Sequence, residues 1–489
     1  MKEKYRELIT VFSLILIDLA MFYLGLTLAY YSRIFALHFV ESYLREFYPR
    51  FPLVFPFSHL LSFWWMPVVF LITFTYENLY SDRYPFWEEA KLLIKADLLS
   101  VLSISGILFL GHLTSRTSAV AILFLFFYGI FLFPLGRYIG KRLLSKMNLW
   151  NHRTLIIGAG VVGQQAAAGL IKEKHMGYSI IGFLDDDPNK SGKTVRIDNT
   201  DYPIIGNITD AEKIIQTLGV ELAVVAIPSL KKEKYLTLTQ KIQKITRKLF
   251  VVPDIQGVAL LNTKLLYLFM QETMLLNIKN NLHSSWNQFI KRVFDLTISL
   301  LLVPFLVPLF IIIGFLIKIE SRGNVFYFQQ RIGRRGEKIK IFKFRTMFQD
   351  ADAKLEEILQ NDPAAREEWE KYQKLKNDPR VTRIGKILRY TSLDELPQII
   401  NVIKGDMSLV GPRPALEEQI ENFYKDNKDY YYLTRPGITG LWQISGRNQL
   451  NFESRVRLET WYVLNWSLWL DIIILIRTIS VVLKREGAY

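Results

Sequence analysis

The stretch that organises this chain reads Thr391-Ser-Leu-Asp-Glu-Leu-Pro-Gln-Ile-Ile-Asn-Val-Ile-Lys-Gly-Asp-Met-Ser-Leu-Val-Gly-Pro-Arg-Pro414. It places two adjacent carboxylates, Asp394 and Glu395, shortly before a glycine-proline-arginine loop. Ser392 and Glu395 also fit the S-x-x-E capping box, in which the acid only satisfies backbone N–H groups at a helix start. A carboxylate that attacks phosphorus needs cations to neutralise the phosphoryl oxygens, so the neighbouring motifs decide between the two interpretations.

Four neighbouring motifs supply cations and glycines around this stretch. They are Lys343-Phe-Arg-Thr-Met347, Gly411-Pro-Arg-Pro414, Arg435-Pro-Gly-Ile-Thr-Gly440 and Ser445-Gly-Arg-Asn448. Arginine and lysine neutralise phosphate, and glycine lets a backbone approach a ligand closely. The combination favours a phosphoryl-transfer site over a helix cap.

With these motifs, residues 288–489 resemble the monotopic phosphoglycosyl transferases, also called polyprenyl-phosphate hexose-1-phosphate transferases. The whole chain resembles the large bacterial form of that family. Three further motifs support a closer match to the members that transfer galactose phosphate: Asn377-Asp-Pro-Arg380, Trp461-Tyr-Val463 and Gly487-Ala-Tyr489. The resemblance implies transfer of a hexose 1-phosphate from a UDP-sugar to undecaprenyl phosphate with release of UMP, the first membrane step of O-antigen, capsule or exopolysaccharide synthesis.

The same resemblance implies roles for individual residues. Asp394 is expected to be the nucleophile that forms a covalent aspartyl–phosphosugar, and Glu395 to help hold Mg²⁺, a cation that prefers oxygen ligands and shared phosphates. At the position of Glu459 the family normally has Asp, which weakens its assignment. The remaining candidates are Lys343, Arg345, Arg413, Arg435, Gln443 and Arg447 for phosphate and substrate binding, with Glu459 and Asp471 as supporting acids.

Composition agrees with a membrane enzyme that handles phosphates. The chain has 489 residues, of which 50% are hydrophobic and 14% aromatic, with a net charge of +15. Long apolar segments favour lipid and phosphate partners for this charge and make nucleic acid an unlikely partner. The chain has no cysteine, which excludes disulfides and thiolate metal sites.

Residues 1–149 are predicted to form a four-helix transmembrane domain. Four apolar segments, at about 9–31, 57–79, 93–113 and 118–139, each approach the length that crosses a bilayer. Asp18 and Asp97 lie inside two of them and are expected to face other helices or to lie near a membrane interface. Basic residues before the first segment and after the fourth place both ends in the cytoplasm, in a multi-pass protein of the bacterial inner membrane.

Residues 150–282 are predicted to form a Rossmann-like α/β domain. A strand leads into a G-x-G-x-x-G turn at Gly158, Gly160 and Gly163, and the second strand, 178–184, ends at Asp185. Further strands are expected at 221–227 and 249–253. This pattern binds NAD or another nucleotide in many proteins. The resemblance makes the domain an accessory module, so tight helix–strand packing is the favoured interpretation of the turn and a bound nucleotide the less favoured one.

The catalytic domain, 288–489, is predicted to be mainly helical and to begin with a re-entrant membrane helix at 291–318. Its uncharged run, 296–317, is long enough to cross a bilayer, but Pro304 and Pro308 interrupt its middle and both flanks are basic. A bent helix that enters and leaves by the same face satisfies both observations. The resemblance includes such a helix, whose usual Ser-Pro at the bend appears here as Val307-Pro308.

Other segments of the catalytic domain are expected to meet the membrane surface. Residues 331–345 are strongly basic and suit lipid head groups, and residues 466–485 are predicted to form an interfacial amphipathic helix with Trp466 and Trp469 as anchors. The charged segment 350–378 has no assigned role. A homodimer is the default oligomeric state.

Three alternatives remain at this point. Glucose can replace galactose as the transferred sugar. A membrane nucleotide-sugar dehydratase needs a Tyr-x-x-x-Lys pair behind a second glycine motif, and Tyr372 to Lys376 and Tyr424 to Lys428 have the spacing without that motif. A nucleotide-gated membrane regulator uses the same modules but leaves Asp394 and Glu395 unexplained.

Overall fold

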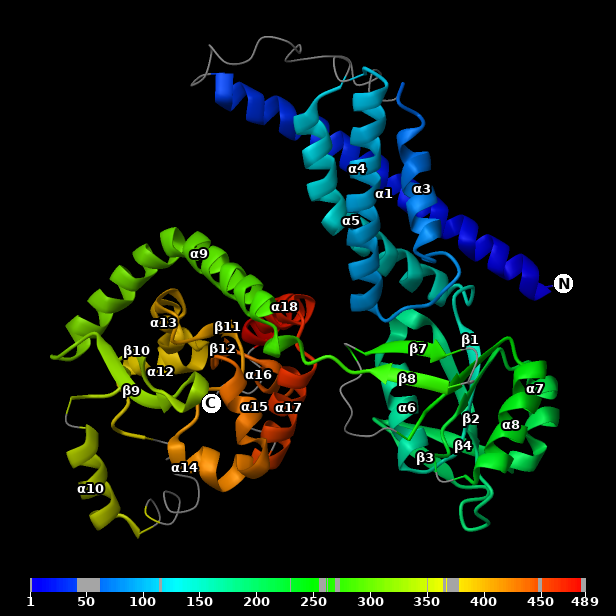
Figure 1. Ribbon diagram of the computed structural model, residues 1–489. Helices are drawn as coiled ribbons and strands as arrows, with labels where there is room; N and C mark the ends of the chain where they lie inside the picture. Colours follow the sequence, from blue (N-terminus) through cyan, green and yellow to red (C-terminus); the bar gives the residue numbers. More distant parts are fainter. Residues whose placement is uncertain are drawn as a thin grey trace. The chain divides into compact units, whose positions relative to one another are not determined.

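The structure is a computed structural model, and it divides into two compact units, Met1–Gln256 and Gly257–Tyr489 (Figure 1). It describes residues 2–41, 62–113, 117–228, 230–254, 261, 263–268, 273–349, 351–363, 366, 378–446 and 451–484. The first unit contains a helical membrane domain and an α/β domain, and the second contains the dyad Asp394–Glu395. Each unit is described by itself.

In the described residues of the membrane domain, four apolar helices are present: α1 (Lys2–Glu41), α3 (Met66–Tyr76), α4 (Phe86–Leu110) and α5 (Ala119–Lys146). Three of them, α1, α4 and α5, are long and apolar enough to cross a membrane, as predicted. The fourth predicted span is only partly seen, because α3 has 11 residues and residues 57–61 lie outside the described part of the chain. At about 17 Å, α3 alone is shorter than a bilayer core.

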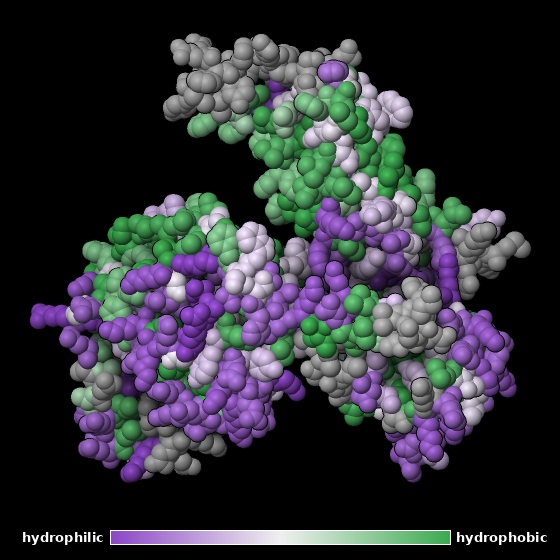
Figure 2. All heavy atoms as spheres, in the orientation of Figure 1, coloured by the Kyte–Doolittle hydropathy of each residue, from purple (hydrophilic) through white to green (hydrophobic). Residues whose placement is uncertain are grey.

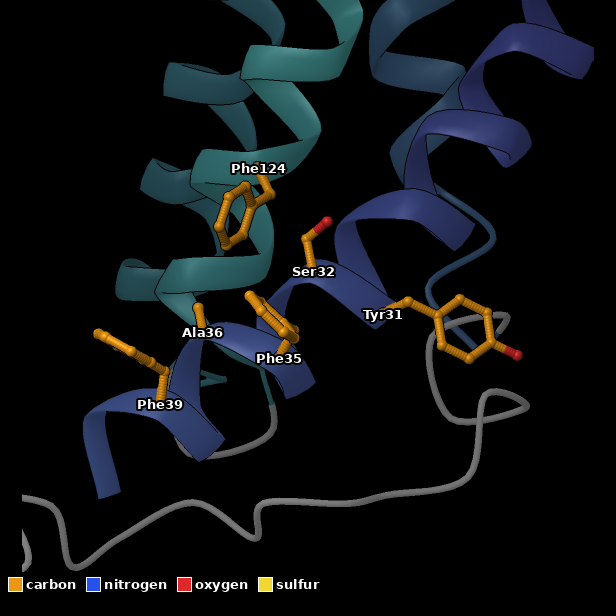
Figure 3. Close-up of a pocket in the computed structure, with 6 residues that line it drawn as sticks. All are labelled: Tyr31, Ser32, Phe35, Ala36, Phe39 and Phe124. Carbon is orange, nitrogen blue, oxygen red and sulfur yellow. The ribbon is translucent and has the colours of Figure 1, made fainter. Parts of the chain in front are cut away.

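Helices α1 and α5 pack closely because glycine lines their contact. A Cβ atom on Gly136 would lie 2.4 Å from Met21 Cγ, and one on Gly140 would lie 2.3 Å from Ile17 Cδ1. Small residues spaced four apart let membrane helices approach to backbone contact. Farther along the same two helices, Figure 3 shows an apolar pocket with a cavity volume of about 630 Å³, lined by Tyr31, Ser32, Phe35, Ala36, Phe39 and Phe124.

Buried charges join the membrane helices to one another and to the α/β domain. Arg137 donates to both carboxylate oxygens of Asp18, at 2.9 and 2.7 Å, and Lys141 donates to Glu89 at 2.6 Å. Glu89 also contacts His175 of the α/β domain. Asp18 and Asp97 both face neighbouring helices, as expected, and Asp97 lies directly against Gly129 of α5.

The α/β domain is a doubly wound sheet of six strands in the order β3-β4-β2-β1-β5-β6, in which all neighbours except β3 and β4 are parallel. The four predicted strands are confirmed as β1, β2, β5 and β6. The elements are β1 (His152–Ile157), α6 (Val161–Lys172), η2 (Lys174–Met176), β2 (Tyr178–Leu184), β3 (Thr194–Ile197), β4 (Thr200–Gly206), η3 (Ile208–Asp210), α7 (Ala211–Leu218), β5 (Leu222–Val225), α8 (Lys232–Ile245) and β6 (Lys248–Val251).

The second unit is mainly helical, as predicted. It begins with a β7–β8 hairpin and continues into α9, which has 36 residues and contains Pro304 and Pro308. Its other elements include the antiparallel pair β9–β10 and the short parallel pair β11–β12. The bounds are β7 (Lys264–Leu268), β8 (Thr273–Asn277), η5 (Asn281–His283), α9 (Ser285–Glu320), β9 (Phe326–Ile332), η6 (Arg334–Gly336), β10 (Lys338–Phe344), α10 (Ala351–Asn361), α12 (Arg383–Thr391), η7 (Leu393–Glu395), α13 (Gln398–Lys404), β11 (Ser408–Val410), α14 (Glu417–Gln419), η8 (Ile420–Tyr424), η9 (Lys425–Asn427), α15 (Lys428–Leu433), β12 (Gly437–Thr439), α16 (Leu441–Ile444), α17 (Phe452–Leu464) and α18 (Leu468–Lys484).

Helix α9 arches over the second unit and bends near its middle (Figure 1). Its outer surface is hydrophobic, whereas most of the visible remainder of this unit is hydrophilic (Figure 2). Leu300, Phe305, Ile311 and Phe315 are 57–77% exposed on it. An exposed apolar surface of this size is typical of a segment that lies in lipid.

Helix α18 is held differently from the expectation for its tryptophans. Trp466, predicted as an interfacial anchor, is 2% exposed and donates from Nε1 to Asp471 at 3.0 Å. That prediction is wrong for Trp466, because the indole packs into the core of the unit. The exposed side chains Ile476, Ile479 and Leu483 form the apolar stripe of α18 instead.

Candidate active site

The two carboxylates lie in the short helix η7, between α12 and α13. Ser392 ends α12 in the left-handed conformation, with φ 57°, and its side chain makes no capping hydrogen bond. The capping-box interpretation of Ser392 and Glu395 is therefore wrong. The left-handed residue turns the chain sharply, so Asp394 and Glu395 follow α12 in a separate turn.

Two cations hold Glu395 through one oxygen atom. Lys343 Nζ donates to Glu395 Oε1 at 2.9 Å, and Arg413 Nη2 donates to the same atom at 3.0 Å. Burial opposes ionisation, but Arg413 and Lys343 outweigh it and lower the pKa of Glu395 to about 2. The structure therefore brings Lys343 and Arg413, both predicted to bind phosphate, against the acidic pair, and Glu395 is a carboxylate at neutral pH.

Asp394 is in a different electrostatic state from its neighbour. Among the described residues, no side chain donates a hydrogen bond to it. Burial raises the pKa of Asp394 to about 6, helped by the negative charge of Glu395 and opposed by Lys343 and Arg389. Asp394 is therefore mostly ionised near neutral pH and has free acceptor capacity, which suits a nucleophile or a ligand-binding carboxylate.

Sequence reasoning missed Arg389. It lies on α12, its Nε donates to Thr346 Oγ1 at 3.0 Å, and its charge lowers the pKa of Asp394. Arg389 and Asp394 are five residues apart, a spacing that does not place two side chains on one helix face. Ser392 also ends the helix between them. Only the tertiary turn brings the two charges together.

Lys343 is positioned by the sheet beneath the dyad. It lies on β10, and Asn401 of α13 fixes this strand by accepting from Phe342 N at 3.0 Å and donating to Lys340 O at 2.7 Å. Asn401 is fully buried, and these bonds replace the missing neighbour of an edge strand. The contact sets α13, and with it the dyad, against the strand that carries Lys343.

Arg413 is positioned by a buried acid. Glu459 Oε1 accepts from the backbone N–H of Arg413 at 3.0 Å and from Arg455 Nε at 3.0 Å, and Tyr424 donates to Oε2. Arg455 also donates to the carbonyl of Arg413 at 2.9 Å. Glu459, predicted as a supporting acid, therefore supports the loop that carries Arg413, and its direct contacts are with that loop and not with the dyad.

Glycines bring the Arg413 loop and the β12 turn together. A Cβ on Gly411 would lie 2.4 Å from Arg435 O, and one on Gly440 would lie 2.2 Å from Gly411 O. A Cβ on Gly437 would lie 2.1 Å from Gly411 N. Any larger residue at these positions must push two backbones apart, which explains the glycines of both motifs.

The comparisons with known proteins agree with this arrangement. The model of the bacterial sugar transferase family matches residues 286–485, and the CoA-binding domain model matches residues 80–253. The undecaprenyl-phosphate galactose phosphotransferase of Salmonella typhimurium is 38% identical over 410 residues, which are 84% of each chain. The chain belongs to the bacterial sugar transferase family.

Two further relatives match different shares of the transferase. The UDP-galactose-lipid carrier transferase of Erwinia amylovora is 40% identical over 84% of each chain. The exopolysaccharide production protein ExoY of Rhizobium meliloti is 47% identical over 199 residues, which are 41% of this chain and 88% of that protein. Among solved structures, UDP-D-quinovosamine 4-dehydrogenase from Vibrio fischeri matches 22% of this chain and 80% of its own at 23% identity, with a TM-score of 0.19, which is too low for an argument about fold.

Other predicted site residues of the transferase have structural contacts. Arg345 donates to Ser321 O and Arg322 O, at 2.8 and 2.6 Å, and closes the turn after α9. Gln443 is buried and donates to Ile438 O. Their roles toward substrate stay predictions, and Arg447 lies outside the described residues.

Asp471 of the transferase is a fully buried anchor. It accepts from Lys291 at 2.6 Å, from Tyr462 at 2.7 Å and from Trp466 at 3.0 Å. These bonds tie α18 to α9 and α17. With three protein donors and no exposure, Asp471 has an architectural role in this structure, and a role in metal or base chemistry finds no support in its contacts.

In the α/β domain, the acid that follows the second strand is hydrogen-bonded to the glycine turn. Asp185, expected to hold a ribose, accepts from Ala159 N within the turn at 2.9 Å and from Lys190 at 3.0 Å. A Cβ on Gly163 would lie 1.8 Å from Gly158 O, so the third glycine serves close packing. A carboxylate bonded inside the turn does not fit a pyrophosphate there, and we assign no NAD, CoA or other nucleotide to this domain.

The dyad has a donor set that fits Mg²⁺. Both cations bonded to Glu395 use Oε1, which leaves Oε2 available as an oxygen ligand beside Asp394, to which no side chain of the described residues donates. Among the described residues no group of three or more His, Cys, Asp or Glu side chains forms a metal cage. Mg²⁺ is commonly held by one or two carboxylates together with substrate phosphates, so a dyad is sufficient.

Proposed function

We propose that this transferase moves a hexose 1-phosphate, galactose 1-phosphate by the names of its relatives, from a UDP-sugar to undecaprenyl phosphate through a covalent intermediate on Asp394. The observation that carries the proposal is the asymmetry of the dyad. Glu395 is held as an anion by Lys343 and Arg413, whereas among the described residues no side chain donates a hydrogen bond to Asp394 beside it.

The proposed chemistry exchanges one phosphoanhydride for another. A carboxylate oxygen of Asp394 attacks the sugar-bearing phosphorus of the UDP-sugar, and the bond to the bridging oxygen breaks as UMP leaves with that oxygen. A phosphate oxygen of undecaprenyl phosphate then attacks the same phosphorus, and the Asp394 carboxylate is released. No ATP is needed, because the number of phosphoanhydride bonds does not change.

The neighbouring residues have distinct roles in this proposal. Lys343 and Arg413 neutralise phosphoryl oxygens that gather charge in the transition state, and Arg413 presents a planar fork for two of them. Glu395 and the substrate phosphates would hold Mg²⁺, which supplies further charge neutralisation for the leaving UMP. Arg389 favours the ionised form of Asp394 and faces the same carboxylate that carries the sugar phosphate.

A lipid acceptor requires a site at the membrane surface, and α9 supplies it as a re-entrant helix. Near its start Arg292 donates to Val402 O and Ile403 O, and at its end Glu320 accepts from Arg383 N and Ile384 N. Both ends are therefore bonded to one unit, whereas a straight helix of 36 residues would separate them by about 54 Å. The bend and the exposed apolar middle support entry and exit by one face of the inner membrane, with the dyad in the cytoplasm.

The function is tested by the nucleotide that is released. Protein in nanodiscs is incubated with UDP-galactose, Mg²⁺ and undecaprenyl phosphate, with UDP-glucose as the parallel donor. We expect at most one equivalent of UMP per protein without the lipid acceptor and continuous release with it, and loss of at least about a thousandfold of the rate in Asp394→Asn. The exposed Asp429→Asn is the matched control. Release of UDP would mean ordinary glycosyl transfer and would contradict the covalent mechanism.

The re-entrant path of α9 is tested by labelling, which the absence of cysteine makes direct. Ser285→Cys and Asn324→Cys place one thiol at each end of the helix. In inverted inner-membrane vesicles, we expect an impermeant maleimide to label both thiols. Labelling of only one of them would mean that α9 crosses the bilayer.

A further inference from the structure

Three arginines from distant parts of the second unit meet at the C-terminal end of α13. Arg292 of α9 donates to Val402 O at 2.5 Å and to Ile403 O at 2.9 Å. Arg435 Nε donates to Gly405 O at 2.6 Å, and Arg334 Nη2 donates to Gln288 Oε1 at 2.7 Å. The carbonyls at the end of this seven-residue helix account for Arg292 and Arg435, but Arg334 bonds Gln288 of α9 and lies near them without a carbonyl partner at the helix end.

The cluster has more positive charge than its surroundings neutralise. Burial lowers the pKa of Arg435, and the nearby charges of Arg334 and Arg292 lower it further. Asp295, the acid that acts on Arg435 in the opposite direction, already accepts from Leu409 N at 3.2 Å. Half-buried cations that repel one another cost free energy, and a bound anion would offset that cost.

The arginines also retain donors and border a small recess. Arg435 uses Nε, and Arg334 uses Nη2, for the bonds given above, so each guanidinium has further N–H groups. A recess with a cavity volume of about 10 Å³ is lined by the polar residues Gln288, Lys291, Arg334, Thr434 and Arg435 together with Leu282 and Leu433. A recess of this volume admits about one oxygen atom of a phosphate group, and the other oxygen atoms of that group would lie at its opening. Guanidinium forks around such a recess match the tetrahedral oxygens of phosphate.

We propose that Arg292, Arg334 and Arg435 form a phosphate-binding subsite at the C-terminal end of α13, separate from the dyad at its N-terminal end. The seven residues of α13 separate the two ends by about 10 Å, so the subsite does not hold the reacting phosphorus. The ligand is a phosphate ester, from a phospholipid head group or from a soluble phosphate.

The first turns of α9 favour the lipid head group as the source. Trp286 and Phe289 are 67% and 57% exposed, and their rings stack with centroids 5.6 Å apart. Exposed aromatic residues of this kind lie at the membrane interface, at the depth of the head groups. Gln288 and Arg292, on the same turns, bond the cluster, so the arginines lie at that depth too. The subsite rests on the membrane contact of α9 and not on the chemistry of Asp394.

Ligand-dependent thermal stability of the full chain in detergent tests the subsite. The probes are short-chain phosphatidylglycerol, inorganic phosphate and the corresponding diacylglycerol, which lacks phosphate. A ligand that binds only the folded state raises the melting temperature. We expect phosphatidylglycerol to raise it, with a dissociation constant at least about tenfold weaker in Arg334→Gln and Arg435→Lys, because each loses charged hydrogen bonds.

Two control variants assign the effect to the cluster. Arg196→Gln removes one exposed charge from the α/β domain, and Lys343→Gln removes a cation from the dyad; both should keep the response. A response to inorganic phosphate that is lost in the same cluster variants would support the subsite with a soluble ligand. No response of the unmodified protein to either phosphate probe, or a response unchanged in Arg334→Gln and Arg435→Lys, would overturn the proposal, whatever the outcome of the UMP assay.

Discussion

The base of the membrane domain and the active site both bring acids and cations together, but they use them differently. At the base, Asp18, Glu89, Arg137 and Lys141 are 0–3% exposed, and each is bonded to an opposite charge. In the active site, Lys343 and Arg413 share one oxygen of Glu395 and are 22% and 34% exposed, while Asp394 has no cation bonded to it.

The difference distinguishes charges that stabilise the fold from charges that are available for a reaction. A buried ion whose partners are all protein groups cannot meet a substrate, and removal of one partner leaves the other uncompensated. A carboxylate that stays unbonded beside a neutralised neighbour retains lone pairs for a reacting atom or a metal ion. The same residue types therefore predict opposite responses to substitution in the two regions.

The largest effect is expected at the base of the membrane domain. Arg137→Ala removes the partner of Asp18 and a neighbour of Glu89, and leaves Asp18 buried without a cation, whereas Glu89 keeps Lys141. Breaking a buried ion pair in this way costs about 3–5 kcal/mol. Thermal unfolding in detergent measures the loss, with the exposed Arg142→Ala on the same helix as control. Equal melting temperatures for the two variants would mean that the base is not held by its charges.

The next effect is expected in the active site, on rate and not on stability. Glu395→Gln keeps the shape of the side chain but removes the charge that Lys343 and Arg413 bind, and it weakens the metal site. We expect the rate of UMP release to fall about a hundredfold, which is the usual effect of removing one preorganised electrostatic group. Glu417→Gln, at an exposed ion pair, is the control. An unchanged rate would remove Glu395 from the mechanism.

Much of both regions follows from sequence because it depends on local pattern. The long apolar segments predict α1, α4 and α5, and the glycine turn predicts the start of the α/β domain. The motifs indicate that Lys343 and Arg413 lie near the dyad. Segment lengths and motif spacing contain this information before any tertiary contact forms.

The sequence predictions are wrong where a residue distant in the sequence determines the local structure or contact. Ser392 has the local pattern of an N-cap, but α12 runs into it and ends there in the left-handed conformation. Trp466 looks like an interfacial anchor, but Asp471 binds its indole within the core. Arg389 acts on Asp394 across a chain turn. No window of neighbouring residues specifies these contacts, so a single sequence cannot predict them.

A smaller effect is expected from pH, again only in the active site. With a pKa of about 6, Asp394 is protonated and unreactive at lower pH, so the rate should rise about tenfold per pH unit up to about pH 6 and then level off. Single-turnover UMP release measures this profile. Because Lys343 lowers the pKa of Asp394, Lys343→Met should move the inflection to higher pH. An inflection that stays in place would mean that another group limits the rate.

The smallest effect is expected inside the membrane domain, at the buried acid Asp97. Neither carboxylate oxygen of Asp97 has a hydrogen-bond partner among the described residues, and the group lies against Gly129 of α5. Asp97→Ala removes a buried unpaired acid at the cost of a small cavity, so we expect it to stabilise the domain by about 1 kcal/mol. Asp18→Ala, which leaves the buried Arg137 with only the more distant carboxylate of Glu89, should have the opposite sign. If both variants lower the melting temperature, the buried carboxylate of Asp97 stabilises the domain as that of Asp18 does, and the contrast between the two acids is wrong.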